Sequence, residues 1–174
     1  MLRSPSRYVA FLRGVSPLNA KMPELKSAFE LAGFEDVRTL LTSGNIVFSA
    51  SRSSEATLAR KAETAMTQHL DHSFVTFVRS VDDLRRLLRT LPYAAFAAKP
   101  RSTRVVTFLR EPPKLTPKLP LELPGARILC IQGRQVFADY AAETRGPALM
   151  QLLQKTFGRA ITTRTWQTVE RAAR

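Results

Sequence analysis

Two spacing patterns of apolar residues alternate along the chain. Short apolar runs bounded by glycine, proline or arginine are typical of buried strands, whereas leucine and alanine at intervals of three or four positions are typical of helices that face a core. In the first half this pattern predicts strands at residues 7–14, 37–42, 46–49 and 74–79. It predicts helices at residues 23–33, 53–70 and 80–91, and Pro92 ends the third one. The predicted order is therefore β-α-β-β-α-β, followed by one extra helix.

The second half repeats most of this order. The run Arg104–Arg110 is identical to Arg7–Arg13 at five of seven positions. A hairpin follows at residues 126–140, around Gly133, and then come a helix at 144–158, a strand at 160–164 and a terminal helix at 166–174. The first helix has no counterpart, because residues 111–124 contain five prolines, which exclude a regular long helix. We expect a short helical turn or an extended crossing loop there.

Two β-α-β units separated by a hairpin make a ferredoxin-like sandwich, a four-stranded antiparallel sheet with helices on one face. The fold class predicted here is α+β, with two tandem ferredoxin-like (βαββαβ) subdomains related by internal duplication. The second subdomain lacks a regular first helix. The expected boundaries are 1–93 for the first subdomain with its extra helix, 94–102 for a connector and 103–174 for the second subdomain.

The composition of the chain indicates where in the cell the protein is expected. The hydrophobic fraction of 44% among 174 residues is ordinary for a globular protein. No apolar run reaches the roughly 18–20 residues that a membrane helix needs, and the basic start lacks the apolar stretch of a signal peptide. Cys130 is the only cysteine, which agrees with a reducing compartment. These features predict a cytoplasmic protein with no membrane partner.

The net charge of +13, from 27 basic and 14 acidic residues, favours phosphate-rich partners such as an anionic small molecule or a nucleic acid. Twenty of the basic residues are arginine and they are dispersed. Arginine together with abundant alanine is also what a GC-rich coding bias produces, so the charge alone leaves both explanations open.

The usual catalytic and metal-binding motifs are absent: no phosphate-binding loop, nucleophile elbow, Cys-x-x-Cys pair or His-Glu-x-x-His helix occurs. His69 and His72 flank Asp71, and we interpret them as capping residues rather than metal ligands. The alternation around Cys130 indicates packing in a strand. The sequence therefore predicts no metal and no cofactor, and it names no catalytic residue.

Three places offer groups that bind anions or planar ligands: the end of the first strand, the turn of the first hairpin, and a guanidinium beside the single tryptophan. The predicted ligand-binding residues are Arg13, Gly14, Ser43, Gly44, Asn45, Arg164 and Trp166. Each place also has a structural interpretation, namely a strand-end arginine, a tight turn and a core tryptophan.

Several short motifs carry a resemblance to a known family. They are Tyr8-Val-Ala-Phe-Leu-Arg-Gly14, Met22-Pro23 with Leu25, Gly33-Phe34 with Asp36-Val-Arg38, Ser43-Gly-Asn-Ile-Val-Phe48 and Thr162-Thr-Arg-Thr-Trp166 with Thr168-Val169. Together they resemble the bacterial domain of unknown function 1697 family over essentially the whole chain. The resemblance implies an α+β protein with two related ferredoxin-like subdomains, and it implies no established activity.

The chain departs from the family pattern in three places. Family members resemble Arg-Gly-Ile-Asn-Val-Gly-Gly after the first strand, whereas this chain continues from Gly14 as Val-Ser-Pro-Leu-Asn. In the closing motif Thr165 and Gln167 stand where the family has asparagines, and residues 111–124 replace a more helical segment. If those polar groups bind a ligand in the family, the ligand of this chain differs.

From these features we expect a bacterial protein that acts as a binding module for an anionic or phosphorylated ligand. The alternatives are a nucleic-acid-binding protein, an enzyme acting on a phosphorylated or carboxylated small molecule, and a structural or oligomerising domain. The nucleic-acid alternative requires exposed aromatic side chains on the first and third strands of a sheet. The candidates are Phe11, Phe48, Phe108 and Phe137, and the competing interpretation is that they fill the core.

Overall fold

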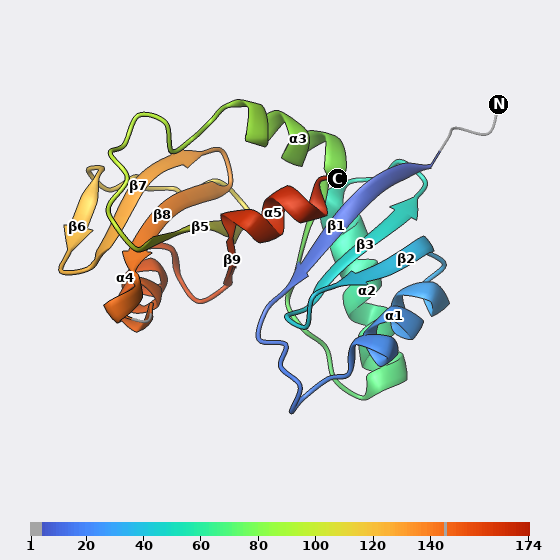
Figure 1. Ribbon diagram of the computed structural model, residues 1–174. Coiled ribbons are helices and arrows are strands. Elements are labelled where there is room, and N and C mark those ends of the chain that lie inside the picture. The colour runs from blue at the N-terminus through green and yellow to red at the C-terminus, as the bar shows by residue number, and fades with distance from the viewer. Residues whose placement is uncertain (1–4, 145) are drawn as a thin grey trace. The chain divides into compact units, whose positions relative to one another are not determined.

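The computed structural model describes residues 5–144 and 146–174, which form two compact units. The first unit consists of residues 5–86 with Arg171–Arg174, and the second is Leu87–Glu170. The described residues have an α+β fold with two antiparallel sheets and five α-helices (Figure 1). The α+β class is therefore confirmed, whereas the three boundaries expected from the sequence stay a prediction.

The first unit contains β1 (Ser6–Leu12), α1 (Met22–Leu31), β2 (Glu35–Leu40), β3 (Asn45–Ala50), α2 (Glu55–Leu70) and β4 (Thr76–Ser80), and the unit boundary falls within α3 (Val81–Arg89). Its sheet has the order β2-β3-β1-β4. Local chemistry sets the helix starts. Pro23 lies in the first turn of α1, and the Ser54 hydroxyl accepts a hydrogen bond from the amide of Thr57 at 3.1 Å.

Helices α1 and α2 cover one face of this sheet (Figure 1). The core between them is made by alternating side chains of the strands, such as Ala10 and Phe48, and by the apolar stripes of the two helices, such as Phe29 and Met66. All four of these side chains are fully buried. The alternation in the strands and the helical spacing in the helices therefore meet in one core, as the sequence predicts.

The second unit contains β5 (Ser102–Leu109), β6 (Leu121–Leu123), β7 (Ala126–Gln132), β8 (Gln135–Ala141), a 3-10 turn η1 (Ala142–Thr144), α4 (Pro147–Phe157) and β9 (Ile161–Thr165), and it shares α5 (Trp166–Ala172) with the first unit. The sheet order is β6-β7-β8-β5-β9. Helix α4 packs on this sheet through Leu149 and Leu153, which lie in one buried cluster with Val105 and Ile161.

The proline-rich segment between β5 and β7 is extended, which is one of the two forms expected, but it ends in the short strand β6, which the sequence did not predict. Leu119 and Leu121 of this segment pack against the same core as α4. Two side chains on an extended chain thus supply part of the cover that a first helix would give.

The opposite face of the second sheet is covered by aromatic rings. The Tyr93 ring lies edge-on to those of Phe137 and Trp166, at centroid distances of 5.6 and 5.3 Å. Beside them, Arg127 and Asp139 form a buried two-bond ion pair, with Nε 2.9 Å from Oδ1. The same guanidinium donates to the carbonyl of Ala97 at 3.1 Å. The residues before β5 are therefore fastened to the sheet by specific polar and aromatic contacts.

No helix among the described residues is long and apolar enough to cross a membrane.

Candidate functional site

Five of the predicted ligand-binding residues come together at one end of the first sheet. The amide of Leu12 donates to the carbonyl of Gly44 at 2.9 Å, which joins the end of β1 to the turn between β2 and β3. Arg13 and Gly14 follow directly, and the amide of Arg13 donates to the carbonyl of Val75 at 2.9 Å. The end of the first strand and the hairpin turn, which the sequence could only name separately, are therefore neighbours.

The polar groups of this turn also have structural partners. The Asn45 side-chain amide is fully buried and donates to the carbonyl of Leu40 at 3.0 Å and to the Ser43 hydroxyl at 3.1 Å. Gly44 has φ +74°, and a Cβ there would lie 2.7 Å from the Cγ2 of Val15. Packing and internal hydrogen bonds account for Asn45 and Gly44, and whether the turn also binds a ligand stays a prediction.

Arg164 and Trp166, the remaining predicted residues, belong to the second unit. Arg164 donates from Nη1 to the Thr162 hydroxyl at 2.7 Å and to the carbonyl of Thr163 at 2.9 Å. Burial lowers the pKa of its guanidinium to about 10. Trp166 is half-buried, and its ring packs edge-on against those of Tyr93 and Phe137. Their role in ligand binding likewise stays a prediction.

His72 behaves as a capping residue, as the sequence predicts. Its Nδ1 lies 2.7 Å from the carbonyl oxygen of Leu70, at the end of α2, and its Nε2 lies 3.1 Å from the carbonyl oxygen of Asn19. Asn19 closes its own loop by donating to the carbonyl of Gly14 at 2.7 Å. The imidazole therefore links the end of α2 to the loop after β1. Among the described residues, no group of three or more histidine, cysteine or acidic side chains is placed to hold a metal.

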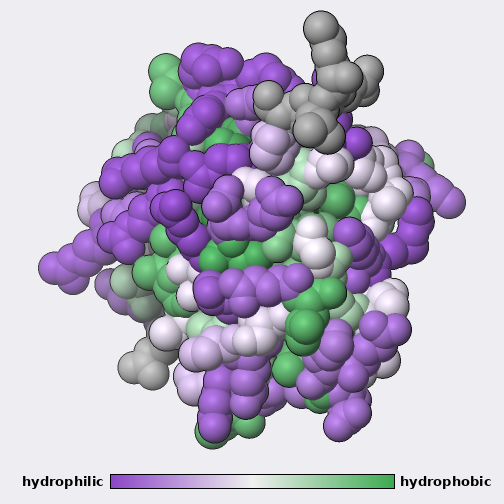
Figure 2. All heavy atoms as spheres, turned by 90° about the vertical axis from the view of Figure 1, so that its right-hand side faces the viewer, coloured by the Kyte–Doolittle hydropathy of each residue, from purple (hydrophilic) through white to green (hydrophobic). Residues whose placement is uncertain are grey.

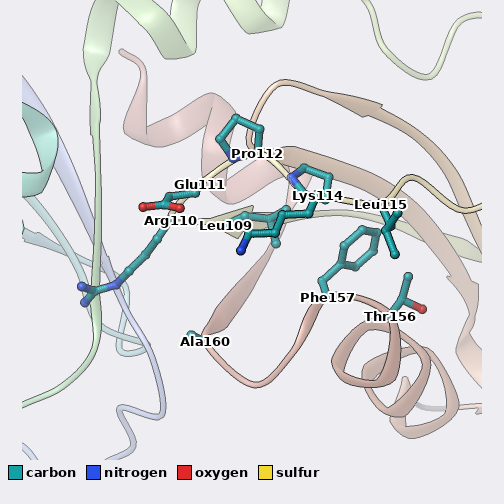
Figure 3. Close-up of a pocket in the computed structure, with 10 residues that line it drawn as sticks. Leu109, Arg110, Glu111, Pro112, Lys114, Leu115, Thr156, Phe157 and Ala160 are labelled. Atoms are coloured by element: carbon teal, nitrogen blue, oxygen red, sulfur yellow. The ribbon is translucent and has the colours of Figure 1, made fainter.

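A cavity that the sequence did not indicate opens at the end of β5. It has a volume of about 530 Å³ and lies between the start of the proline-rich segment, the end of α4 and the turn before β9. The lining residues are Leu109, Arg110, Glu111, Pro112, Pro113, Lys114, Leu115, Thr156, Phe157 and Ala160. In Figure 3 the side chains of Leu115 and Phe157 lie beside each other, while Arg110 extends away from them.

The charge around this cavity is positive. Arg110 and Lys114 line it against the single carboxylate of Glu111, and all three side chains are exposed. Arg134 lies next to it, because its Nη1 donates to the carbonyl of Arg110 at 3.4 Å. The carboxyl end of α4 adds a partial negative charge of about half a unit, but Lys155 lies in its last turn. The second unit as a whole has 13 basic and five acidic residues, a net charge of +8.

A second groove, in the first unit, has different chemistry. It lies between α1 and the end of α2, has a volume of about 330 Å³ and includes Glu24, Ser27, Leu31 and His69. Among the residues that the structure describes, no lysine or arginine lines it. The side of the molecule that carries α1 and β2 is seen in Figure 2, where hydrophilic side chains cover most of the surface and apolar ones show in patches between them. This groove is therefore a weaker candidate for an anion than the cavity beside β5.

These observations define the class: a basic α+β protein with two antiparallel sheets and an open cationic cavity in its second unit. The chain belongs to the family described as protein of unknown function (DUF1697), whose model matches residues 6–126. The resemblance noted in the sequence is thereby confirmed. The match includes the 109–115 wall of the cavity and ends before α4.

The search among curated proteins gave no match. Among solved structures, the chain is similar to the conserved bacterial protein SP0830 from Streptococcus pneumoniae, with 24% identity and a TM-score of 0.69. The similarity covers 98% of this chain and 97% of that one. At this identity the likeness shows the fold alone.

The sequence indicated two features beside the cavity, although it did not indicate the cavity itself. Arg110 directly follows its strand, as Arg13 does in the first half, and the prolines excluded a regular long helix after it. What the pattern lacked was the partner wall, because Thr156, Phe157 and Ala160 are about 45 residues away in the chain.

Proposed function

We propose that the second unit binds a small anionic molecule in the cavity at the end of β5. The observation that carries the proposal is the cavity itself, of about 530 Å³, with Arg110 and Lys114 in its lining and one carboxylate. Ligand sites are concave, and a few charged groups in them fix the orientation of the ligand. A guanidinium and an ammonium are the side chains that hold carboxylates and phosphates most strongly.

We further infer that both units follow one ferredoxin-like plan produced by internal duplication. The support is that the order β2-β3-β1-β4 of the first sheet recurs as β7-β8-β5-β9 in the second, with β6 added at the edge. In this comparison α2 corresponds to α4, and α1 corresponds to the proline-rich segment. The cavity then has a simple origin, since it lies where the first unit has α1 against the end of α2.

The nucleic-acid alternative is less well supported. An RNA-reading sheet stacks bases on exposed aromatic side chains, but Phe11, Phe48, Phe108 and Phe137 are all 0% exposed. The enzymatic alternative has only Glu111 as a carboxylate in the cavity lining, and general acid–base chemistry with two carboxylates would need a second one. The cytoplasmic location predicted from the sequence and the identity of the anionic ligand stay part of the proposal.

Titration calorimetry of the full chain with inorganic phosphate and pyrophosphate at low salt tests this function. Lys114→Ala removes one charge from the cavity and is expected to weaken binding about fivefold, the effect of losing about 1 kcal/mol from one charge-assisted contact. Lys118→Ala is the matched control, since it removes the same charge from the same segment outside the cavity lining.

If Lys118→Ala weakens binding as much as Lys114→Ala, the anion is held by diffuse surface charge and the site assignment is wrong. Absence of binding to the unmodified protein at low salt would contradict the function as a whole.

A further inference from the structure

We infer that the ligand of this cavity carries a flat apolar ring next to its negative charge, an inference that rests on the proposed anion-binding function. The ligand class is therefore an aryl phosphate or an aryl carboxylate. The reason lies in the residues that line the cavity. Six of the ten lining residues are apolar, namely Leu109, Pro112, Pro113, Leu115, Phe157 and Ala160. A bare inorganic anion would contact the cations and leave these walls in water.

Leu115 and Phe157 are the two side chains with most to gain from a ring. Leu115 is 85% exposed, although it is a large hydrophobic residue. Phe157 packs only partly against the core below α4. Both line the cavity, and Figure 3 shows them beside each other. A ring placed against them would remove apolar surface from water on the protein and on the ligand at once.

The shape favours a ring over an alkyl chain. The cavity is open to solvent, so it offers no enclosed tunnel in which a long chain is covered along its length. Phe157 instead lines the cavity with an aromatic ring (Figure 3), and a pair of aromatic rings gains more than its buried area alone provides. A cation over the face of an aromatic ring is attracted by the ring, and Lys114 lines the same cavity.

The floor and the rim have separate tasks in this arrangement. Leu109, at the end of β5, is only 5% exposed and forms a fixed floor. Arg110 leaves the same strand end and extends away from the apolar walls in Figure 3. The ring is therefore expected on the side of Leu115 and Phe157, and the negative group on the side of Arg110 and Lys114.

Calorimetric titration of the full chain with inorganic phosphate, phenyl phosphate and cyclohexyl phosphate tests the inference. The three probes share the anion and differ in having no ring, a flat ring and a puckered ring. We expect phenyl phosphate to bind at least tenfold more tightly than inorganic phosphate, and several-fold more tightly than cyclohexyl phosphate. Leu115→Ala should weaken phenyl phosphate about fivefold and leave inorganic phosphate unchanged.

Leu18→Ala is the matched control, since Leu18 is 98% exposed and lies in the first unit. It should change none of the three affinities. Both leucines are exposed, so neither variant removes core packing.

The outcomes separate this inference from the function on which it rests. Equal affinities for phenyl and inorganic phosphate would overturn the ring and leave the anion site standing. Cyclohexyl phosphate binding as tightly as phenyl phosphate would overturn the flat-ring requirement. No binding of any probe would overturn both.

Discussion

Replacing Gly44 by alanine is expected to destabilise the first unit by about 2–5 kcal/mol. Two costs combine. A side chain at φ +74° is held in the left-handed region, which costs about 1–2 kcal/mol for a residue other than glycine. The added Cβ would also lie 2.7 Å from Cγ2 and 2.9 Å from Cβ of Val15, and 3.1 Å from Cβ of Leu12. Overpacking of this kind costs about 1–3 kcal/mol.

Gly14→Ala is the matched control. Gly14 has φ +78°, nearly the same backbone conformation, but nothing lies within 4 Å of a Cβ built on it. It should therefore cost only the backbone part, about 1–2 kcal/mol. In the double variant Gly44→Ala with Val15→Ala, part of the stability lost through overpacking should be regained, because Cγ2 of Val15, the atom closest to the new Cβ, has been removed.

Native-state hydrogen exchange of the β1 and β3 amides measures these costs within the first unit, without assuming that both units unfold together. Equal losses of protection in Gly44→Ala and Gly14→Ala would refute the reasoning. The hairpin glycine would then serve only its own turn geometry, and a ligand role for the turn would gain weight.

Three further predictions concern single contacts. Burial raises the pKa of the Tyr93 phenol above its ordinary value of 10.0. The stability that the neutral phenol adds is therefore complete below pH 10 and is lost as the pH rises further. Unfolding followed by circular dichroism should show that stability falls more steeply above pH 10 in the native protein than in Tyr93→Phe. Asp139→Ala leaves the buried Arg127 charge without its ion-pair partner. It should lower the free energy of unfolding by about 3 kcal/mol, measured by urea unfolding followed by Trp166 fluorescence. The double variant Arg127→Met with Asp139→Leu should lower it much less, and similar losses in both variants would contradict this reasoning. His72→Phe keeps an aromatic ring but removes the polar contact with Asn19, and amide exchange in residues 14–20 should accelerate about fivefold, the effect of roughly 1 kcal/mol, with His69→Phe as the unaffected control.

Most elements of the fold were predictable because the core requires them to be periodic. In β1 the apolar run at Val9–Leu12 had to be buried on both faces, and all of these residues are fully buried. In α2 the spacing of Leu58, Ala62 and Met66 fixed the buried stripe. Prolines fixed the absence of a helix in residues 111–124, but β6 escaped detection because three residues are too few to show a period.

The site was less predictable, for two physical reasons. Turn residues look the same whether they bind an ion or permit close packing, and only the position of Val15 shows why Gly44 must lack a side chain. A cavity arises where packing is incomplete, so it depends on which distant segments meet. No sequence pattern predicts that Leu115 and Phe157 lie close together, since Leu115 lies in a loop and Phe157 ends α4.

The most direct test of the central claim is to map an anion onto the backbone by NMR, with phenyl phosphate titrated into the isotope-labelled full chain at low salt. Saturable shifts of the amides of Leu109, Arg110, Glu111, Lys114, Leu115 and residues 156–160 are predicted, with those of residues 13–19 and 43–45 unmoved. Shifts confined to Arg13, Gly14 and the 43–45 turn, or to Arg164 and Trp166, would place the ligand where the sequence alone suggested and would contradict the cavity beside β5.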